Sequence, residues 1–157
     1  MQKETSFTNE ELAYYQRHLS LPLIGEIGQQ KLKNARVLCV GAGGLGCPLL
    51  LYLAGAGVGT IGIADGDYVE LSNLHRQILY TQEDIGKLKT EIAGEKLAKL
   101  NPYVNAISHP LMLNEQNAFE IISHYDIVAD CSDNFATRYL INDACFYLKK
   151  SFFRKQT

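Results

Sequence analysis

The chain has 157 residues, the size of one domain or part of one, and its 46% apolar content is sufficient for a buried core. A formal net charge of −2 provides no basic surface for nucleic acid or for an anionic membrane. The longest apolar run, 47–56, is too short to cross a bilayer. We therefore expect neither nucleic acid nor a membrane as a partner.

The cysteines and the N-terminus indicate a cytoplasmic protein. None of the four cysteines lies in the C-x-x-C spacing of a zinc site. Most of them fall in predicted buried elements, which is typical of reduced thiols. No signal peptide is visible in residues 1–9. Cytoplasmic localisation and the absence of zinc ligands are both expectations from the sequence.

Residues 1–34 are predicted to form a helical extension in front of the main domain. Thr8 and Glu11 have the spacing of a capping box, which predicts a helix that continues to about Leu19. A second short helical segment is expected over residues 24–34.

Short apolar strands alternate with helices between residues 35 and 150, which we take as the main domain. Predicted strands lie at 36–40, 60–64, 104–108 and 126–130, and predicted helices run from the following turns to about 56, 100, 123 and 150. This alternation predicts an α/β fold, a Rossmann-like parallel sheet with helices on both faces. The expected strand order is third, second, first, fourth, which places a ligand at the carboxyl ends of the first and fourth strands.

A glycine-rich turn follows the first predicted strand. Gly41, Gly43, Gly44 and Gly46 form a G-x-G-x-x-G pattern that opens the next helix, and Asp65 ends the second strand. Such a turn can be purely structural when it stands alone. Its position between a strand and a helix, with an acid after the next strand, favours a nucleotide site.

Two acids follow the second strand, and each has more than one interpretation. Asp65 is either a solvated residue at the strand end or a ligand of ribose hydroxyls, and its place at the carboxyl edge favours ribose. Asp67 either orders the following loop or lies near a metal ion.

A long polar connection follows, over residues 66–85, and connections of this length tend to be functional. Asn73, Arg76 and Lys89 are each typical of a surface when taken singly, but together they suit a polyphosphate. A dinucleotide needs no such set, because its pyrophosphate lies on a helix N-terminus. The pattern therefore favours a nucleoside triphosphate over NAD.

Asp133 and Asn134 follow the fourth strand, and either could cap the next helix. Asp133 could also bind magnesium, which commonly takes one or two protein carboxylates together with phosphate oxygens. Its position across from the glycine turn favours the magnesium interpretation.

The ordered motifs of the chain resemble those of the bacterial MoeB/ThiF/HesA proteins, which are relatives of the ubiquitin-activating enzymes. Within this family the chain looks closest to the MoeB branch, the molybdopterin-synthase adenylyltransferases, but MoeB and ThiF share these motifs. The motifs cover about residues 13–150 and include Tyr15-Gln16-Arg17, Gly41 to Gly46, Asp65-Gly66-Asp67, Ser72 to Gln77, Gly86 to Lys89, and Asp130 to Asn134 with Arg138.

The resemblance implies an enzyme that uses ATP and magnesium to adenylylate the C-terminal Gly-Gly carboxylate of a ubiquitin-like sulfur carrier. The carrier would be MoaD- or ThiS-like, for molybdopterin or thiamine biosynthesis, and the enzyme would be a homodimer. Arg17 would reach the ATP of the other subunit, and Asp133 would hold magnesium.

The resemblance also implies the remaining site residues. The catalytic set is Arg17, Arg76, Lys89 and Asp133. The nucleotide-binding set is Gly41, Gly43, Gly44, Gly46, Asp65, Asp67, Ser72, Asn73, Leu74, His75, Arg76, Lys89, Asp133 and Asn134.

The sequence departs from the family pattern after residue 150. Residues 151–157 are expected to be an aberrant tail rather than the family's next strand, as after a frameshift, a premature stop or artificial shortening. The strand at 126–130 would then become an unprotected edge. The family's second half, with its carrier-binding surface and zinc-binding cysteines, would be missing. The alternative function is therefore an inactive nucleotide-binding fragment.

Overall fold

A five-stranded parallel sheet, with the strand order β3-β2-β1-β4-β5, forms the centre of the computed structural model, which describes residues 7–154. The strands are β1 (Arg36–Val40), β2 (Thr60–Ala64), β3 (Asn105–His109), β4 (Ile127–Asp130) and β5 (Ser151–Arg154). The expected order of the first four strands is confirmed, although β3 begins one residue later than predicted. The described chain adds a fifth strand.

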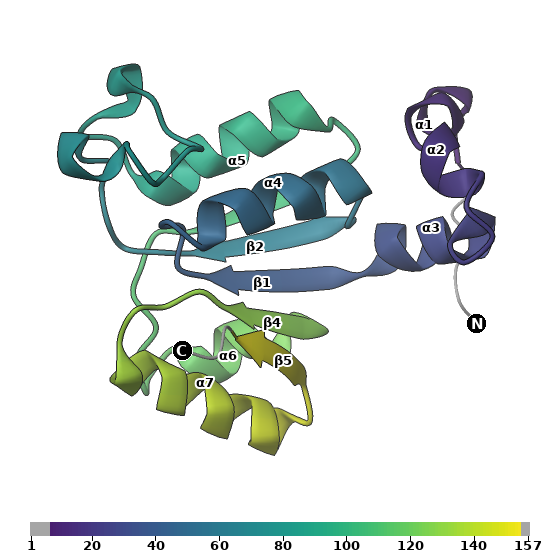
Figure 1. Ribbon diagram of the computed structural model, residues 1–157. Coiled ribbons are helices and arrows are strands. Elements are labelled where there is room, and N and C mark those ends of the chain that lie inside the picture. The colour runs from purple at the N-terminus through teal and green to yellow at the C-terminus, as the bar shows by residue number, and fades with distance from the viewer. Residues whose placement is uncertain (1–6, 155–157) are drawn as a thin grey trace.

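Helices cover both faces of the sheet (Figure 1). They are α4 (Gly46–Ala56) and α5 (Lys89–Leu100) on one face, and α6 (Ala118–Ser123) and α7 (Phe135–Leu148) on the other. Ile63 packs with Leu50 and Leu97 on the first face, whereas Leu38 packs with Ile122 on the second. This two-sided burial explains why the central strands are continuous apolar runs.

The register of the strands places their carboxyl ends at one edge of the sheet. Val40, the last residue of β1, lies opposite Ala64 of β2 and Asp130 of β4. The chain leaves each of these strands at the same level, so the segments that follow them converge.

The helices of the second face are shorter than predicted, for local reasons. The expected first turn of α6 is instead a side-chain turn, in which the Asn114 Oδ1 accepts hydrogen bonds from the backbone N–H of Gln116 and of Asn117. At the other end, α7 stops before Lys149, which adopts a left-handed φ of 54°.

The N-terminal extension comprises α1 (Asn9–Tyr14), α2 (Gln16–Leu19) and α3 (Gly25–Asn34). The capping box is confirmed, since Thr8 Oγ1 accepts from the N–H of Glu11 and the Glu11 carboxylate accepts from the N–H of Thr8. The prediction of one continuous helix to Leu19 is wrong, because the helix is interrupted at Tyr15.

Tyr15, the residue at this interruption, is buried and attaches the extension to the domain. The Tyr15 hydroxyl accepts a hydrogen bond of 2.7 Å from the Asn101 side chain. Its ring lies against Gly57, where a Cβ would come within 2.6 Å of it. The buried amide of Gln29 donates a second bond, of 2.9 Å, to the Ala56 carbonyl oxygen. The extension is thus fixed at the C-terminal ends of α4 and α5 (Figure 1).

The prediction that the segment after residue 150 adds no strand is wrong for Ser151–Arg154. β5 pairs in parallel with β4, with Phe152 opposite Val128. Phe152 packs against the core of the α6–α7 face, whereas Phe153 points away and is half exposed. β4 is therefore not an edge strand of the described sheet, and the predicted unprotected edge at β4 is wrong.

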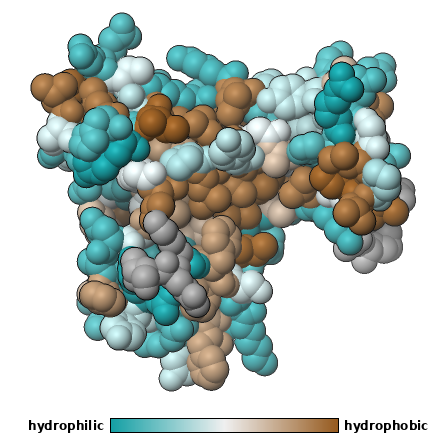
Figure 2. All heavy atoms as spheres, viewed as in Figure 1, coloured by the Kyte–Doolittle hydropathy of each residue, from teal (hydrophilic) through white to brown (hydrophobic). Residues whose placement is uncertain are grey.

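Figure 2 shows apolar side chains gathered over the middle of the view, where the sheet and α4 lie, and a mixture of hydrophilic and apolar side chains over the loop at the upper left. Among residues 7–154 there is no helix with the length and apolar character needed to cross a membrane.

Candidate functional site

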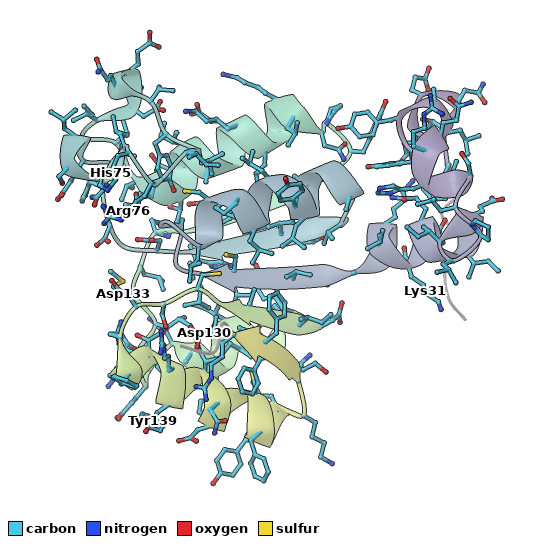
Figure 3. All side chains as sticks on the ribbon, in the orientation of Figure 1. Lys31, His75, Arg76, Asp130, Asp133 and Tyr139 are labelled. Atoms are coloured by element: carbon cyan, nitrogen blue, oxygen red, sulfur yellow. The ribbon has the colours of Figure 1, made fainter. Side chains whose placement is uncertain are left out.

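A cleft of about 690 Å³ opens at the carboxyl edge of the sheet, where β1, β2 and β4 end. Residues 66–89, called here the loop wall, form one side, and residues 131–138, called here the helix wall, form the other. Figure 3 shows Arg76 and Asp133 on these two walls. The predicted nucleotide-binding residues that line the cleft are Gly41, Gly43, Gly44, Asp65, Asp67, Asn73, Arg76, Lys89, Asp133 and Asn134.

The glycine turn between β1 and α4 forms the floor of the cleft, and its two ends require glycine. Gly41 has a φ of 94°, and a Cβ there would lie 2.8 Å from the carbonyl oxygen of Cys131. A Cβ at Gly46 would lie 2.0 Å from the carbonyl oxygen of Gly41. At Gly43 the nearest atom is 3.5 Å from the position of a Cβ. The cleft-facing part of the turn thus leaves its backbone accessible.

Asp65 fixes this turn against β2. Its side chain is buried, with one carboxylate oxygen accepting from the N–H of Ala42 and the other from the N–H of Asp67, both at 2.8 Å. The interpretation of Asp65 as a solvated residue at the strand end is therefore wrong. Each oxygen keeps a second lone pair, so the carboxylate can still accept from a ligand in the cleft.

Lys89 and Asp67 form an ion pair on the loop wall. The Lys89 ammonium lies 3.0 Å from the Asp67 carboxylate, and the Lys89 N–H also donates to the Asp67 carbonyl oxygen. Lys89 is only 4% exposed, so its cation is held at the cleft surface with little freedom. Of the two roles considered for Asp67, these contacts support the ordering of the loop.

Arg76 is held on the same wall by two acceptors. Its guanidinium donates to the side-chain oxygen of Asn73 at 2.8 Å and to the carbonyl oxygen of Ser72 at 3.5 Å. The loop itself is tied to the glycine turn by Tyr80, whose hydroxyl donates to the Ala42 carbonyl oxygen at 2.8 Å. Burial raises the pKa of Tyr80, so this hydroxyl remains a donor at neutral pH.

The loop wall includes two 3-10 turns, Leu71–Asn73 and Gln82–Asp84. The second is closed by Asp84, whose carboxylate accepts from the N–H and hydroxyl of Thr81 and pairs with the Lys96 ammonium. Burial raises the pKa of Asp84, but these hydrogen bonds and the nearby cation outweigh it and lower the pKa to about 2. Contacts of residues that do not line the cleft thus also hold the loop wall in place.

The helix wall is shaped by the residues on either side of Asp133. Asp130 is buried and one of its oxygens accepts from the N–H and the hydroxyl of Ser132, at 3.1 and 2.6 Å. Asn134 caps α7 by accepting from the N–H of Thr137 at 2.9 Å. Of the two predicted caps, Asn134 is therefore the one used. Within residues 7–154, the exposed side chain of Asp133 makes no hydrogen bond or ion pair.

This arrangement fits a magnesium ion that is shared with a ligand. Among residues 7–154 there is no group of three or more histidines, cysteines and acids that could enclose a metal on its own. Magnesium does not need one, because it commonly takes one or two carboxylates together with phosphate oxygens and waters. Asp133 supplies one unpaired carboxylate at the cleft surface.

Several predicted residues lie outside the cleft lining. Gly46 is buried at the end of the turn, Leu74 packs against the core, and Ser72 and His75 are exposed on the loop, with His75 next to Arg76 in Figure 3. Arg17 lies on α2, at the opposite end of the sheet (Figure 1). Arg17 therefore cannot serve the cleft of its own chain, and its role toward a second subunit stays a prediction.

The structure adds residues that the sequence-based site omitted. Arg138 and Gln77 both line the cleft, as do Met112 and Leu113 from the segment after β3. Helical periodicity could have indicated Arg138, which lies one turn beyond Asn134 on α7. No sequence signal pointed to Met112 or Leu113, because only the packing of their loop brings them to the cleft.

Cysteine thiols lie beneath the glycine turn. A hydrogen bond between Cys39 and Cys131 raises the pKa of Cys39 and lowers that of Cys131, which lines the cleft. Cys47 is fully buried, its thiol lies 3.4 Å from the Ala42 carbonyl oxygen, and burial raises its pKa. Cys47 is thus a packed residue of the core.

The sequence model of the ThiF family matches residues 15–157, which include β5. The chain belongs to the ThiF family. It is 53% identical over 144 residues to the sulfur carrier protein adenylyltransferase of Thermus thermophilus, covering 92% of this chain and 53% of that one. It is 55% identical over 146 residues to the adenylyltransferase and sulfurtransferase MOCS3 of Culex quinquefasciatus, covering 93% and 33%. The chain thus spans about half of one relative and about a third of the other.

Solved structures confirm the Rossmann-like fold of this ThiF-family chain. Escherichia coli TcdA, a tRNA N6-threonylcarbamoyladenosine dehydratase, in complex with ATP has a TM-score of 0.89 at 24% identity, covering 95% of this chain and 61% of that one. Escherichia coli MccB with ATP has a TM-score of 0.73 at 32% identity, covering 80% and 38%.

Proposed function

We propose that this ThiF-family chain carries the ATP site of an adenylyltransferase that activates the C-terminal carboxylate of a sulfur carrier protein. The observation that carries the proposal is the cleft itself. Two held cations, Arg76 and Lys89, face an unpaired carboxylate, Asp133, across a glycine turn. A magnesium–triphosphate needs both, whereas a dinucleotide needs neither.

The cleft has an apolar part that suits adenosine. Val40, Ala64, Met112 and Leu113 line it next to the ends of β1 and β2. A base placed there brings its ribose to Asp65, whose carboxylate keeps free lone pairs. The predicted ribose role of Asp65 is consistent with this placement.

The phosphates would lie over the glycine turn. Gly43 and Gly44 leave the backbone accessible at the start of α4, where the helix dipole favours anions. Asn73, Arg76 and Lys89 line the cleft on the adjacent loop wall. Asp133 would hold magnesium from the opposite wall, and the ion would neutralise phosphate charge during the reaction.

The reaction needs no nucleophilic side chain. An oxygen of the carrier's carboxylate attacks the α-phosphorus, the bond from that phosphorus to the bridging oxygen breaks, and pyrophosphate leaves with the electron pair. The product is a mixed anhydride of the carrier with AMP. Because the carboxylate is ionised at neutral pH, no proton has to move. Catalysis consists of positioning together with charge stabilisation by Arg76 and Lys89, to which a magnesium ion held by Asp133 would add.

The expected partner follows from relatives that are named as a sulfur carrier protein adenylyltransferase and as an adenylyltransferase and sulfurtransferase. We expect a MoaD- or ThiS-like carrier, a homodimer in which Arg17 reaches the second site, and a cytoplasmic protein in molybdopterin or thiamine biosynthesis. The exposed position of Arg17, far from the cleft of its own chain, is compatible with a role in a second subunit.

Exchange of labelled pyrophosphate into ATP tests the proposal. With a MoaD- or ThiS-like carrier and magnesium, the chain should catalyse exchange that depends on the carrier's Gly-Gly end. ATP binding without any exchange would favour the alternative of a nucleotide-binding fragment. Tight NAD binding without ATP binding would overturn the assignment of the cleft.

A further inference from the structure

Arg138 brings a third cation to the cleft, from α7 of the helix wall. It is half-buried, with its guanidinium 5.5 Å from the centre of the Phe135 ring. One of its nitrogens donates to the Ser132 carbonyl oxygen at 3.3 Å. That bond orients the guanidinium without neutralising it.

The three cations of the cleft differ in what compensates them. Lys89 is ion-paired with Asp67, and Arg76 donates to an amide oxygen and a carbonyl oxygen of its own loop. Among the ion pairs of residues 7–154, none includes Arg138 or Arg76, but Arg76 is exposed and its side chain makes two hydrogen bonds, whereas Arg138 is half-buried and its side chain makes one. A half-buried guanidinium without a counter-ion, facing a cleft, is suited to bind an anion.

The proposed reaction brings two anions into this cleft. The triphosphate is served by the glycine turn and the cations of the loop wall, so a second anion needs a cation elsewhere. In-line attack also requires the carboxylate to approach the α-phosphorus from the side away from the leaving pyrophosphate. The helix wall provides the remaining cation.

We infer that Arg138 binds the C-terminal carboxylate of the carrier protein and holds it for attack on the α-phosphorus. This inference rests on the proposed function. A guanidinium suits the role because it can donate two parallel hydrogen bonds to a carboxylate, and several of its N–H groups remain after the bond to Ser132.

The buried side chain of Asp130, at the end of β4, positions the wall that carries Arg138. Asp130 holds Ser132 through two hydrogen bonds, and Ser132 in turn accepts from Arg138. The second oxygen of Asp130 is buried and has no hydrogen-bond partner among residues 7–154. The hydrogen bonds between Asp130 and Ser132 and between Ser132 and Arg138 are thus present without a ligand.

A binding experiment tests this assignment without requiring turnover. A MoaD-like carrier ending in a free carboxylate is compared with the same carrier ending in a carboxamide. Both are titrated with magnesium and the α,β-methylene analogue of ATP, which cannot transfer its adenylyl group. Wild type should bind the carboxylate form at least about tenfold more tightly.

The variants isolate the guanidinium. Arg138→Gln should reduce the carboxylate preference to about twofold or less, and Arg138→Lys should keep part of it because the charge remains. Affinity for the ATP analogue should stay within about twofold in both variants. Arg36→Gln is the matched control, since Arg36 is exposed at the opposite edge of the sheet and donates to the His124 carbonyl oxygen.

Each outcome decides the matter. A wild-type chain without preference for the carboxylate, or an Arg138→Gln variant that keeps the preference, overturns the inference. A loss of affinity for the ATP analogue with the preference intact assigns Arg138 to the nucleotide instead. If the preference depends on Arg138 but wild type catalyses no exchange, the carboxylate site stands and the proposed adenylylation fails.

Discussion

The two walls of the cleft satisfy their charges in different ways. Next to the loop wall, Asp65 accepts two backbone hydrogen bonds at the end of β2. On the wall itself, Asp67 pairs with Lys89, and Arg76 is bonded to Asn73. On the helix wall, Asp133 and Arg138 have no charged partner within residues 7–154.

This difference suggests that the loop wall mainly maintains the structure of the cleft, whereas the helix wall mainly binds ligands. Most charged groups of the loop wall are bonded to one another without a ligand and hold the glycine turn in place, although the buried Gln77 Oε1 has no hydrogen-bond partner among residues 7–154. Within residues 7–154, the helix wall presents the Asp133 carboxylate, which has no partner, and the Arg138 guanidinium, which has no ion-pair partner; a magnesium ion and an anion would satisfy them. Changes to the first should alter folding as well as ligand binding, whereas changes to the second should alter ligand binding and catalysis with little effect on folding.

The largest effect is expected for the turn that both walls share. In Gly46→Ala the new Cβ would lie 2.0 Å from the Gly41 carbonyl oxygen, so the turn must move. We expect a loss of about 3 kcal/mol or more in the free energy of unfolding, together with loss of ATP binding. Urea unfolding and titration with a fluorescent ATP analogue measure both.

Gly55→Ala is the matched control on the same helix, because no atom lies within 4 Å of the added Cβ. It should be neutral or stabilise by up to about 1 kcal/mol. If Gly46→Ala had the same unfolding free energy and the same ATP affinity as wild type, the turn would not need glycine at this position.

A smaller and purely functional effect is expected for Asp133→Asn. It removes the one charged ligand proposed for magnesium, so carrier-dependent pyrophosphate exchange should fall about 100-fold or more, while the unfolding free energy changes by less than about 0.5 kcal/mol. Raising the magnesium concentration should restore part of the activity. Asp143→Asn, an exposed acid on α7, should leave exchange unchanged. Undiminished exchange in Asp133→Asn would remove Asp133 from the metal site.

The opposite pattern is expected for Asp65→Asn. An amide group cannot accept both backbone hydrogen bonds, and one N–H of the turn loses its partner. The unfolding free energy should fall by about 2 kcal/mol, and the amide exchange of Ala42 should quicken. If Asp133→Asn lowered the unfolding free energy more than Asp65→Asn does, the proposed difference between the two sides of the cleft would be wrong.

The smallest effect concerns acid stability of the loop wall. The folded-state pKa of Asp84 is lowered to about 2, from 3.8, so its carboxylate adds stability above the unfolded-state value. That stability is lost as the pH falls from about 4 to about 2, and solvent screening limits it to about 1 kcal/mol. Wild type should therefore lose more stability than Asp84→Asn between pH 5 and pH 2.5, in urea unfolding, by about that amount. If the unfolding free energies of wild type and Asp84→Asn changed equally between pH 5 and pH 2.5, the low pKa of Asp84 would be contradicted.

The sequence predicted those parts of the fold that depend on local pattern. β1, β2 and the capping box at Thr8 lie at their predicted residues, because apolar runs and cap spacing are local signals. β5 was missed because a four-residue edge strand buries few side chains, so the pair Phe152-Phe153 between polar residues has no clear period.

The candidate site divides in the same way. Gly41, Asp65 and Asp133 could be found because each follows a recognisable strand, and the strand order brings the strand ends together. Arg138 could not be assigned from its chemistry alone, since an arginine on a helix is usually at the surface. Only packing of α7 against the sheet turns it toward the cleft.

By itself the sequence determined the Rossmann-like order of elements and the glycine turn, because these follow from periodicity and spacing along the chain. It also predicted several residues that the structure brings to one cleft, among them Asn73, Arg76 and Lys89. Tertiary structure alone decided which charges are already paired. Asp67 meets Lys89 and Asp133 meets no partner within the described chain, although both are acids that follow a strand. The reason is physical: pairing depends on distances of a few ångströms between segments far apart in sequence, and only the packed sheet sets those distances.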